Sequence, residues 1–320
     1  MKGSSFSTNE LHVIFGTGPA GCWIARALTA MGIAVRAVNR SGKRPDLLPD
    51  KVELVTADIL DSAQAVRAAQ GAATVYQALN PPFHQYAKQF PVLQKNAIDA
   101  ASAAGARYIS IENLYLLNPS GPITDSSPIV PRSEKGKLRA RMANDVMIAN
   151  RNGVVRAAAI RSSDYYGPGV IISPLGENIF GNLVSGKKAQ IFGTAGKPHS
   201  WAYIEDVGQA AAILGTSEDV FGKAWIIPHA PACSQRFIIE ATWGILGDEP
   251  LVSFASPSML RLTGLFNPHA RTSAEIMDEF IDDFTVKSNR FQRTFGLEPT
   301  PIDFGIVQTI RWFKKRLQAE

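Results

Sequence analysis

The segment GTGPAG at residues 16–21 constrains the fold of this chain more than any other feature. It lies between an apolar run of strand length, residues 12–15, and a helix-length amphipathic segment, residues 20–31. Three glycines at this spacing allow a tight turn and let the backbone approach a pyrophosphate, which the N-terminus of the helix then faces. The sequence therefore predicts a dinucleotide held by Gly16, Gly18, Pro19, Ala20 and Gly21.

Strand-length apolar runs alternate with helix-length segments through the first half of the chain, a pattern typical of a parallel sheet flanked by helices. We expect strands at residues 12–15, 33–38, 52–56, 73–76, 108–110 and 154–160. Helices are expected at 20–31, 62–69, 84–104, 137–150, 175–185, 204–214, 236–246, 273–283 and 304–318. The predicted fold class is α/β, a Rossmann-type doubly wound parallel sheet with a smaller C-terminal substrate domain.

The composition argues against several classes of protein. Lys and Arg number 33 against 28 Asp and Glu, an excess too small and dispersed to indicate nucleic-acid binding. Cys22 and Cys233 have no CxxC partner, and no histidine has another at i+2 to i+4, so we expect neither disulfides nor a metal. The start of the chain is polar, and no apolar run reaches about 18 residues, so a cytoplasmic protein without membrane contact is expected.

The residues after the second expected strand differ from those of an NAD-specific site. Such a site places Asp or Glu there to accept a hydrogen bond from the ribose 2′-hydroxyl. This chain has Asn39, Arg40, Ser41, Lys43 and Arg44. Because a guanidinium can fork onto phosphate oxygens and stack on adenine, the sequence predicts NADP(H), with a solvated basic turn as the alternative. Asp58, after the third strand, is expected to meet the adenine amino group or to be a turn carboxylate.

Further segments resemble landmarks of the extended short-chain dehydrogenase/reductase family, which includes NAD(P)-dependent epimerases, dehydratases and reductases. They are residues 80–82 (NPP), 113–115 (NLY), 161–168 (RSSDYYGP), 201–207 (WAYIEDV) and 295–299 (FGLEP). The resemblance covers nearly the whole chain. It implies an NADP(H)-binding Rossmann domain at residues 1–168 and a mainly substrate-binding region at 169–320, from which roughly 189–228 return to the first domain.

The family's reaction centre, a Tyr-x-x-x-Lys pair with a Ser or Thr at the end of strand five, is altered in this chain. Aligning residues 131–139 with the family's Pro-x-Ser-x-Tyr-Gly-x-Ser-Lys puts Lys135 at the tyrosine and Arg139 at the lysine. We prefer this alignment because the proline, first serine and glycine also match. A shift of two residues would instead put Ser133 and Lys137 at these positions.

The Ser or Thr position at the end of strand five stays open among Ser110, Glu112 and Asn113. The candidate catalytic residues are Lys135, Arg139, Asn113 and Tyr115. A lysine needs tuning by its environment to donate a proton at neutral pH, and the like charge of Arg139 one helical turn away disfavours the ammonium form. Arg139 can also hold the ribose hydroxyls of the nicotinamide. Lys135 is therefore the predicted general acid.

Other uses of Lys135 are a Schiff base, an electrostatic clamp on a carbonyl or carboxylate, or part of a solvated basic face. Asp164 stands where the family usually has Asn, and a pair with Lys135 would favour the ammonium and oppose the tuning by Arg139. The resemblance completes the cofactor set with Asn39, Arg40, Ser41, Arg44, Asp58, Ile59, Asn80, Asp164, Tyr165 and Tyr166. Two cations beside an oxidised, cationic nicotinamide also predict tighter binding of NADPH than of NADP⁺.

His199 occupies the place where nucleotide-sugar enzymes of the family commonly have an arginine, which weakens a nucleotide-sugar reading. We interpret His199 as a loop histidine near Trp201. The predicted function is an NADPH-dependent reductase that transfers hydride to a carbonyl or imine-like carbon of a small, apolar substrate. The alternatives are an epimerase or dehydratase, which needs a base able to deprotonate an alcohol, and a non-catalytic NADP(H)-binding redox sensor. The family also implies a homodimer formed by the two long helices that flank strand five.

Overall fold

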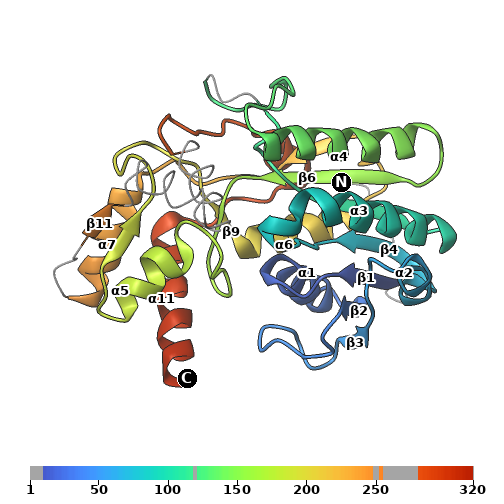
Figure 1. Cartoon of the computed structure of the whole chain (residues 1–320), viewed down its shortest axis with the longest axis horizontal. Helices are drawn as coiled ribbons and strands as arrows, with labels where there is room; N and C mark the ends of the chain where they lie inside the picture. Colours follow the sequence, from blue (N-terminus) through green and yellow to red (C-terminus); the bar gives the residue numbers. More distant parts are fainter. Residues whose placement is uncertain (1–9, 118–120, 248–251, 255–279, 320) are drawn as a thin grey trace.

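The computed structural model describes residues 10–117, 121–247, 252–254 and 280–319 (Figure 1). Its main sheet contains β1 (Leu11–Phe15), β2 (Ala34–Asn39), β3 (Glu53–Thr56), β4 (Ala72–Gln77), β5 (Arg107–Asn113), β6 (Ala157–Ser162) and β10 (Ala224–Ile226). The order is β10-β6-β5-β4-β1-β2-β3, and every neighbouring pair is parallel. This is the doubly wound order 3-2-1-4-5-6 with one more strand beside β6, and it confirms the predicted fold class.

Helices cover both faces of the sheet (Figure 1). One face carries α1 (Pro19–Ala30) and α6 (Ile204–Gly215), and the other carries α2 (Ser62–Ala69), α3 (Tyr86–Ala103) and α4 (Glu134–Arg151). Side chains alternate along each strand, so Ile14 packs with α1 and α6 while Val13 and Phe15 pack with α2 and α3. Burial on both faces explains why the strands read as nearly continuous apolar runs.

The C-terminal half adds smaller elements. Two short parallel pairs join β7 (Tyr165–Tyr166) to β9 (Ala202–Tyr203), and β8 (Ala189–Ile191) to β11 (Val252–Phe254). The helices are a π-helical segment (Gly176–Gly181), α5 (Asn182–Val184), α7 (Gln235–Leu246), α10 (Arg290–Phe295) and α11 (Ile302–Ala319). A separate core forms here around Phe180, Trp201, Ile238 and Phe313. In contrast, α6 and β10 join the main sheet and its helices.

The boundaries of the elements differ from the expected ones in a few places. Strand six runs over residues 157–162 rather than 154–160, because residues 151–154 end α4 and form the turn that follows it. The expected helix at 175–185 begins as a π-helix, and the short strands β7 to β11 were not predicted. The expected helix at 273–283 lies outside the described residues, apart from 280–283, which form no helix. None of the described helices is long and apolar enough to cross a membrane.

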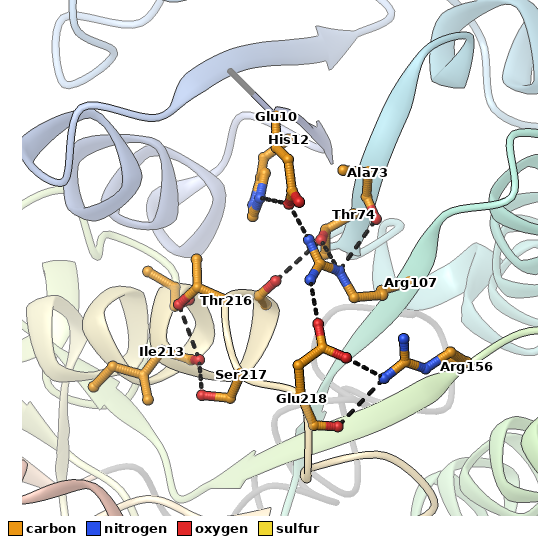
Figure 2. A network of polar contacts seen from close by, with 12 residues as sticks. Glu10, His12, Ala73, Thr74, Arg107, Arg156, Ile213, Thr216, Ser217 and Glu218 are labelled. Carbon is orange, nitrogen blue, oxygen red and sulfur yellow. Dashed lines mark hydrogen bonds and ion pairs between the residues drawn. The ribbon is translucent and has the colours of Figure 1, made fainter. Parts of the chain in front are cut away.

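Charged side chains close the amino end of the sheet, where the strands begin (Figure 2). The guanidinium of Arg107 forms ion pairs with Glu10 and Glu218, and Nε donates a hydrogen bond of 2.9 Å to Thr74 Oγ1. Glu218 also pairs with Arg156 at 2.6 Å. These contacts join the beginnings of four strands, β1, β4, β5 and β6, to the segment after α6.

Candidate functional site

The glycine segment between β1 and α1 has the shape that the sequence predicts. Gly16 has φ +103°, and a Cβ on Gly21 would lie 1.9 Å from the Gly16 carbonyl oxygen, so the backbone of the turn requires both glycines. A Cβ on Gly18 would meet no atom within 4 Å. Gly18 therefore leaves open space beside the first turn of α1, where Pro19 and Ala20 lie. That open space and the free amide groups of the helix start fit a pyrophosphate.

The loop after β2 is organised by Asn39. Its Nδ2 donates to Thr17 Oγ1 at 2.8 Å and to the Lys43 carbonyl at 2.9 Å, and its Oδ1 accepts from Gly42 N at 2.7 Å. The amide group of Asn39 is thus used within the protein, and it links this loop to the glycine segment. Ser41 joins the same turn, because its Oγ accepts a hydrogen bond from Lys43 N.

The three cations of this loop differ in their contacts. Arg44 donates to the carbonyls of Pro49 and Val52, at 2.9 and 2.7 Å, so its guanidinium holds the loop rather than facing a ligand. Arg40 is exposed, as is Lys43, and within the described ranges neither side chain has a hydrogen bond or ion pair. Two cations therefore face solvent at the end of β2, where a 2′-phosphate would lie.

The next cofactor candidates have mainly local contacts. Asp58 Oδ1 accepts from Leu60 N at 3.0 Å, which is the turn role considered for it. Ile59 is buried, and its carbonyl accepts from Asn96 Nδ2 at 2.8 Å. Asn80 is exposed in the loop after β4. These contacts anchor the loop after β3 to α3.

Buried polar atoms without partners gather at the carboxyl end of the sheet. Within the described part of the chain, Gln77 Oε1 and Nε2, Ser110 Oγ, Asn113 Oδ1 and Ser162 Oγ have no hydrogen bond. Gln77 is paired in register with Ser110, and Asn113 with Ser162. Leaving such groups unsatisfied is costly, so their concentration here indicates a polar ligand or water. Sequence reasoning missed Gln77 and Ser162, whose only signal was their place at strand ends.

Helix α4 brings Lys135 into the site. Ser133 caps the helix by accepting from Gly136 N at 3.0 Å, so its hydroxyl serves the helix start. Lys135 Nζ lies 4.2 Å from the ring centroid of Tyr115, which follows β5. The ammonium therefore lies over an aromatic face, a favourable place for a cation.

Arg139 is buried one turn further along α4. Its Nη2 donates to the Ile111 carbonyl at 3.0 Å, and its Cζ lies 4.6 Å from the Phe90 ring centroid. Nε has no partner among the described residues. The guanidinium thus binds the end of β5, and one donor stays available beside the unsatisfied groups there.

Asp164 lies after β6 and is held from two sides. Its Oδ1 accepts from the Tyr115 hydroxyl, and its Oδ2 lies 3.0 Å from His199 Nε2. Burial by itself raises the pKa of Asp164, but the hydrogen bonds from His199 and Tyr115 and the charge of Lys135 together hold it below its ordinary value. The ionised carboxylate of Asp164 therefore lies near the Lys135 side chain.

His199 lies near Trp201, as expected, with 4.2 Å between the ring centroids. It is also only 3% exposed and contacts Asp164. Its Nε2 also lies 3.2 Å from Ser163 Oγ. His229 Nε2 accepts from Ser163 N at 3.2 Å, and burial lowers the pKa of His229 to about 4, so this second histidine is neutral.

The two tyrosines that follow Asp164 lie in different surroundings. Tyr165 is partly buried, and burial raises its pKa, while the charge of Arg139 acts in the opposite direction. Tyr166 is 1% exposed in the C-terminal core, 5.3 Å from the ring of Tyr203. Its assignment to the cofactor site is therefore corrected, because alternation along β7 turns it away from Tyr165. Among the described residues no group of three or more His, Cys, Asp or Glu could hold a metal ion.

The chain is similar to one family model, to two proteins of known sequence and to a solved structure. Residues 16–164 match a family model described as NAD(P)H-binding. A 3beta-hydroxysteroid-dehydrogenase/decarboxylase isoform 2 from Arabidopsis thaliana is 27% identical over 301 residues, 82% of this chain and 52% of the plant protein. A dTDP-glucose 4,6-dehydratase from Mycolicibacterium smegmatis is 21% identical over 311 residues, 91% of this chain and 87% of that protein.

A solved structure agrees over the whole fold. The epimerase Mth375 from Methanothermobacter thermautotrophicus superposes with a TM-score of 0.81 at 13% identity, covering 97% of this chain and 94% of the epimerase. At this identity the likeness establishes the fold. The chain spans about half the length of the plant relative.

Proposed function

From an NAD(P)H-binding domain and the fold of the extended short-chain dehydrogenase/reductase epimerases and dehydratases, we propose that this protein is an NADPH-dependent reductase. Its substrate would be a small, apolar molecule with a carbonyl or imine-like carbon. The observation that carries the proposal is the pair of cations, Arg40 and Lys43, that face solvent in the loop joined to the glycine segment by Asn39 and Thr17.

The residues present fit the cofactor. In this proposal residues 1–168 hold it: the Gly18 backbone and the start of α1 take the pyrophosphate, and Arg40 and Lys43 take the 2′-phosphate. The unsatisfied atoms of Asn113 and Ser162 lie where the nicotinamide half would reach, because a dinucleotide crosses the carboxyl end of such a sheet. When bound, the cofactor supplies the hydride.

Lys135 takes the place of the usual tyrosine beside the substrate. Its ammonium lies over the face of Tyr115, where it can bind a carbonyl oxygen and stabilise the charge that develops there. Arg139 fixes the end of β5 and offers Nε toward the site. Residues 169–320 would supply most of the substrate pocket.

Calorimetry with NADPH, NADP⁺, NADH and NAD⁺ tests the cofactor. Arg40→Ser should weaken NADPH binding about tenfold or more and leave NADH binding nearly unchanged, because only NADPH carries the 2′-phosphate. Arg67→Ser removes the same charge from the exposed face of α2 and is the control. Equal binding of NADPH and NADH by the wild-type protein would overturn the NADP(H) assignment.

Turnover tests the reaction. The protein and NADPH are incubated with a panel of aldehydes, ketones and imines, and Lys135→Ala should abolish any activity found. A second candidate, an epimerase or dehydratase that oxidises an alcohol transiently, is favoured by one observation: Tyr115 already donates to an ionised Asp164, which gives the base that such a reaction needs. No turnover with any carbonyl or alcohol, with NADPH still bound, would favour a redox sensor.

A further inference from the structure

Tyr115, Asp164 and His199 form a continuous line of hydrogen bonds, although 49 residues separate the first pair and 35 the second. Tyr115 follows β5, Asp164 follows β6, and His199 lies in the C-terminal half, where its backbone pairs with Cys233. The outer member, Tyr115, is partly exposed and lies under Lys135. The inner member, His199, is nearly inaccessible.

The chemistry of Asp164 determines the direction of both hydrogen bonds. An ionised carboxylate only accepts, so the Tyr115 hydroxyl and His199 Nε2 must both carry the protons. His199 is held in place by Phe280 and Phe284, whose ring centroids lie 4.7 and 4.9 Å away. A fixed donor on Oδ2 leaves Oδ1 as the carboxylate oxygen that faces Tyr115.

We propose that Tyr115 is the catalytic residue that exchanges a proton with the substrate oxygen, and that Asp164 stores this proton while His199 positions Asp164. The inference rests on the proposed oxidoreductase function. In the oxidising direction the substrate O–H bond breaks and its proton binds Tyr115 Oη, while the Oη–H bond breaks and that proton binds Asp164 Oδ1. The carbon loses its hydride to the oxidised cofactor and becomes a carbonyl carbon. Reduction forms and breaks the same bonds in reverse, and for it Asp164 must first take up a proton from water, because its carboxylate is ionised at rest.

Among the described residues, charged and titratable groups lie on both sides of this line. Lys135 lies over Tyr115, and Arg139 and Tyr165 act on the neighbourhood of Asp164. On the other side His199 faces Ser163 and the neutral His229. Of the charges that face the Tyr115 hydroxyl in the described residues, the anion Asp164 opposes its ionisation and the cation Lys135 favours it.

A substrate-free experiment tests the coupling. In protein labelled with ¹³C at tyrosine Cζ, the Tyr115 signal is assigned with Tyr115→Phe and followed against pH. Asp164→Asn should lower the Tyr115 titration midpoint by about one pH unit or more, because the opposing charge is gone while Lys135 stays. His199→Gln, which can still donate to Oδ2, should change it less than His199→Phe. A midpoint that does not move in Asp164→Asn overturns the proposal.

Turnover of a panel substrate then tests catalysis. Tyr115→Phe should reduce the rate about 100-fold with NADPH affinity unchanged, and Asp164→Asn should reduce the rate by a similar factor. Tyr166→Phe is the matched control, because it removes a buried tyrosine hydroxyl of the C-terminal core that has no hydrogen-bond partner among the described residues. Full activity of Tyr115→Phe would overturn the relay and leave the reductase intact, whereas absence of NADPH binding in the wild-type protein would overturn the function itself.

Discussion

The two ends of the parallel sheet differ in whether their buried polar groups have hydrogen-bond partners. At the amino end Arg107 is ion-paired on both sides, and Thr74 both accepts and donates (Figure 2). His12 shares a hydrogen bond of 2.8 Å with Tyr76 there. At the carboxyl end Gln77 and Ser162 have buried polar atoms without any partner in the described part of the chain. The same strands thus end in a satisfied network on one side and an unsatisfied one on the other.

This difference distinguishes the polar groups that stabilise the fold from those that are available to bind a ligand. Satisfied buried polar groups add modest stability and are costly to break, whereas unsatisfied ones cost stability unless a ligand or water completes them. We therefore expect substitutions at the amino end to change the free energy of unfolding and those at the carboxyl end to change ligand binding.

The largest expected effect is at Arg107. Arg107→Ala leaves Glu10 and Glu218 facing each other beside the hydroxyl of Thr74, so the free energy of unfolding should fall by about 3 kcal/mol. NADPH affinity, measured on the folded variant, should stay the same. Lys95→Ala, which breaks an exposed pair with Asp99 on α3, is the control and should cost about 0.5 kcal/mol or less. If urea unfolding showed equal losses of stability for Arg107→Ala and Lys95→Ala, the network at the amino end would stabilise the protein no more than an exposed ion pair does.

The second expected effect is a dependence on pH. Burial, followed by the charge of Arg107, lowers the pKa of His12 to about 3, against about 6.5 in the unfolded chain. The folded protein binds this proton more weakly, so the stability that depends on neutral His12 is complete above about pH 6.5 and is lost as the pH falls toward 3. The loss approaches roughly 1.4 kcal/mol per pH unit.

Urea unfolding of the wild-type protein and of His12→Gln between pH 7 and 4 checks this. In the variant, the slope of the free energy of unfolding against pH should be smaller by the contribution of one proton. The buried His229 contributes equally to the slope of both proteins. Parallel stability curves would show that folding does not lower the pKa of His12.

The third expected effect concerns the carboxyl end. Gly18→Ala should weaken NADPH binding about tenfold or more with no loss of stability, because its Cβ meets no protein atom but occupies the space left for the pyrophosphate. Gly244→Ala, an equally open position on α7, should leave NADPH affinity unchanged. If Gly18→Ala bound NADPH as the wild type does, the pyrophosphate would have to lie elsewhere.

The smallest effect is a direct comparison of two buried hydroxyls. Thr74→Val removes one that donates to the Gly215 carbonyl at 3.1 Å and accepts from Arg107, and should cost about 1 to 2 kcal/mol. Ser162→Ala removes one without a partner in the described ranges and should leave stability the same or slightly higher. Thermal unfolding of both variants measures the difference, and a larger loss for Ser162→Ala would reverse the comparison.

Much of this protein follows from local sequence. The spacing of Gly16, Gly18 and Gly21 predicts the turn, and the alternation of strands and helices predicts the sheet, because both depend on residues close together in the chain. The cap at Ser133 places Lys135 in the first turn of α4 for the same reason. The sequence likewise predicts the basic loop after β2. Only the structure shows that Arg44 differs from Arg40, because the Arg44 guanidinium donates to carbonyl groups of the loop itself.

What the sequence could not determine depends on which segments meet at the carboxyl end of the sheet. Tyr115, Asp164 and His199 come from three distant segments, and no spacing rule links them. The order of the strands puts β5 beside β6, and the packing of the C-terminal half brings His199 against Asp164. Local patterns are set by backbone geometry over a few residues, whereas the contacts of a buried carboxylate are set by the packing of the whole chain, and only the tertiary structure decides them.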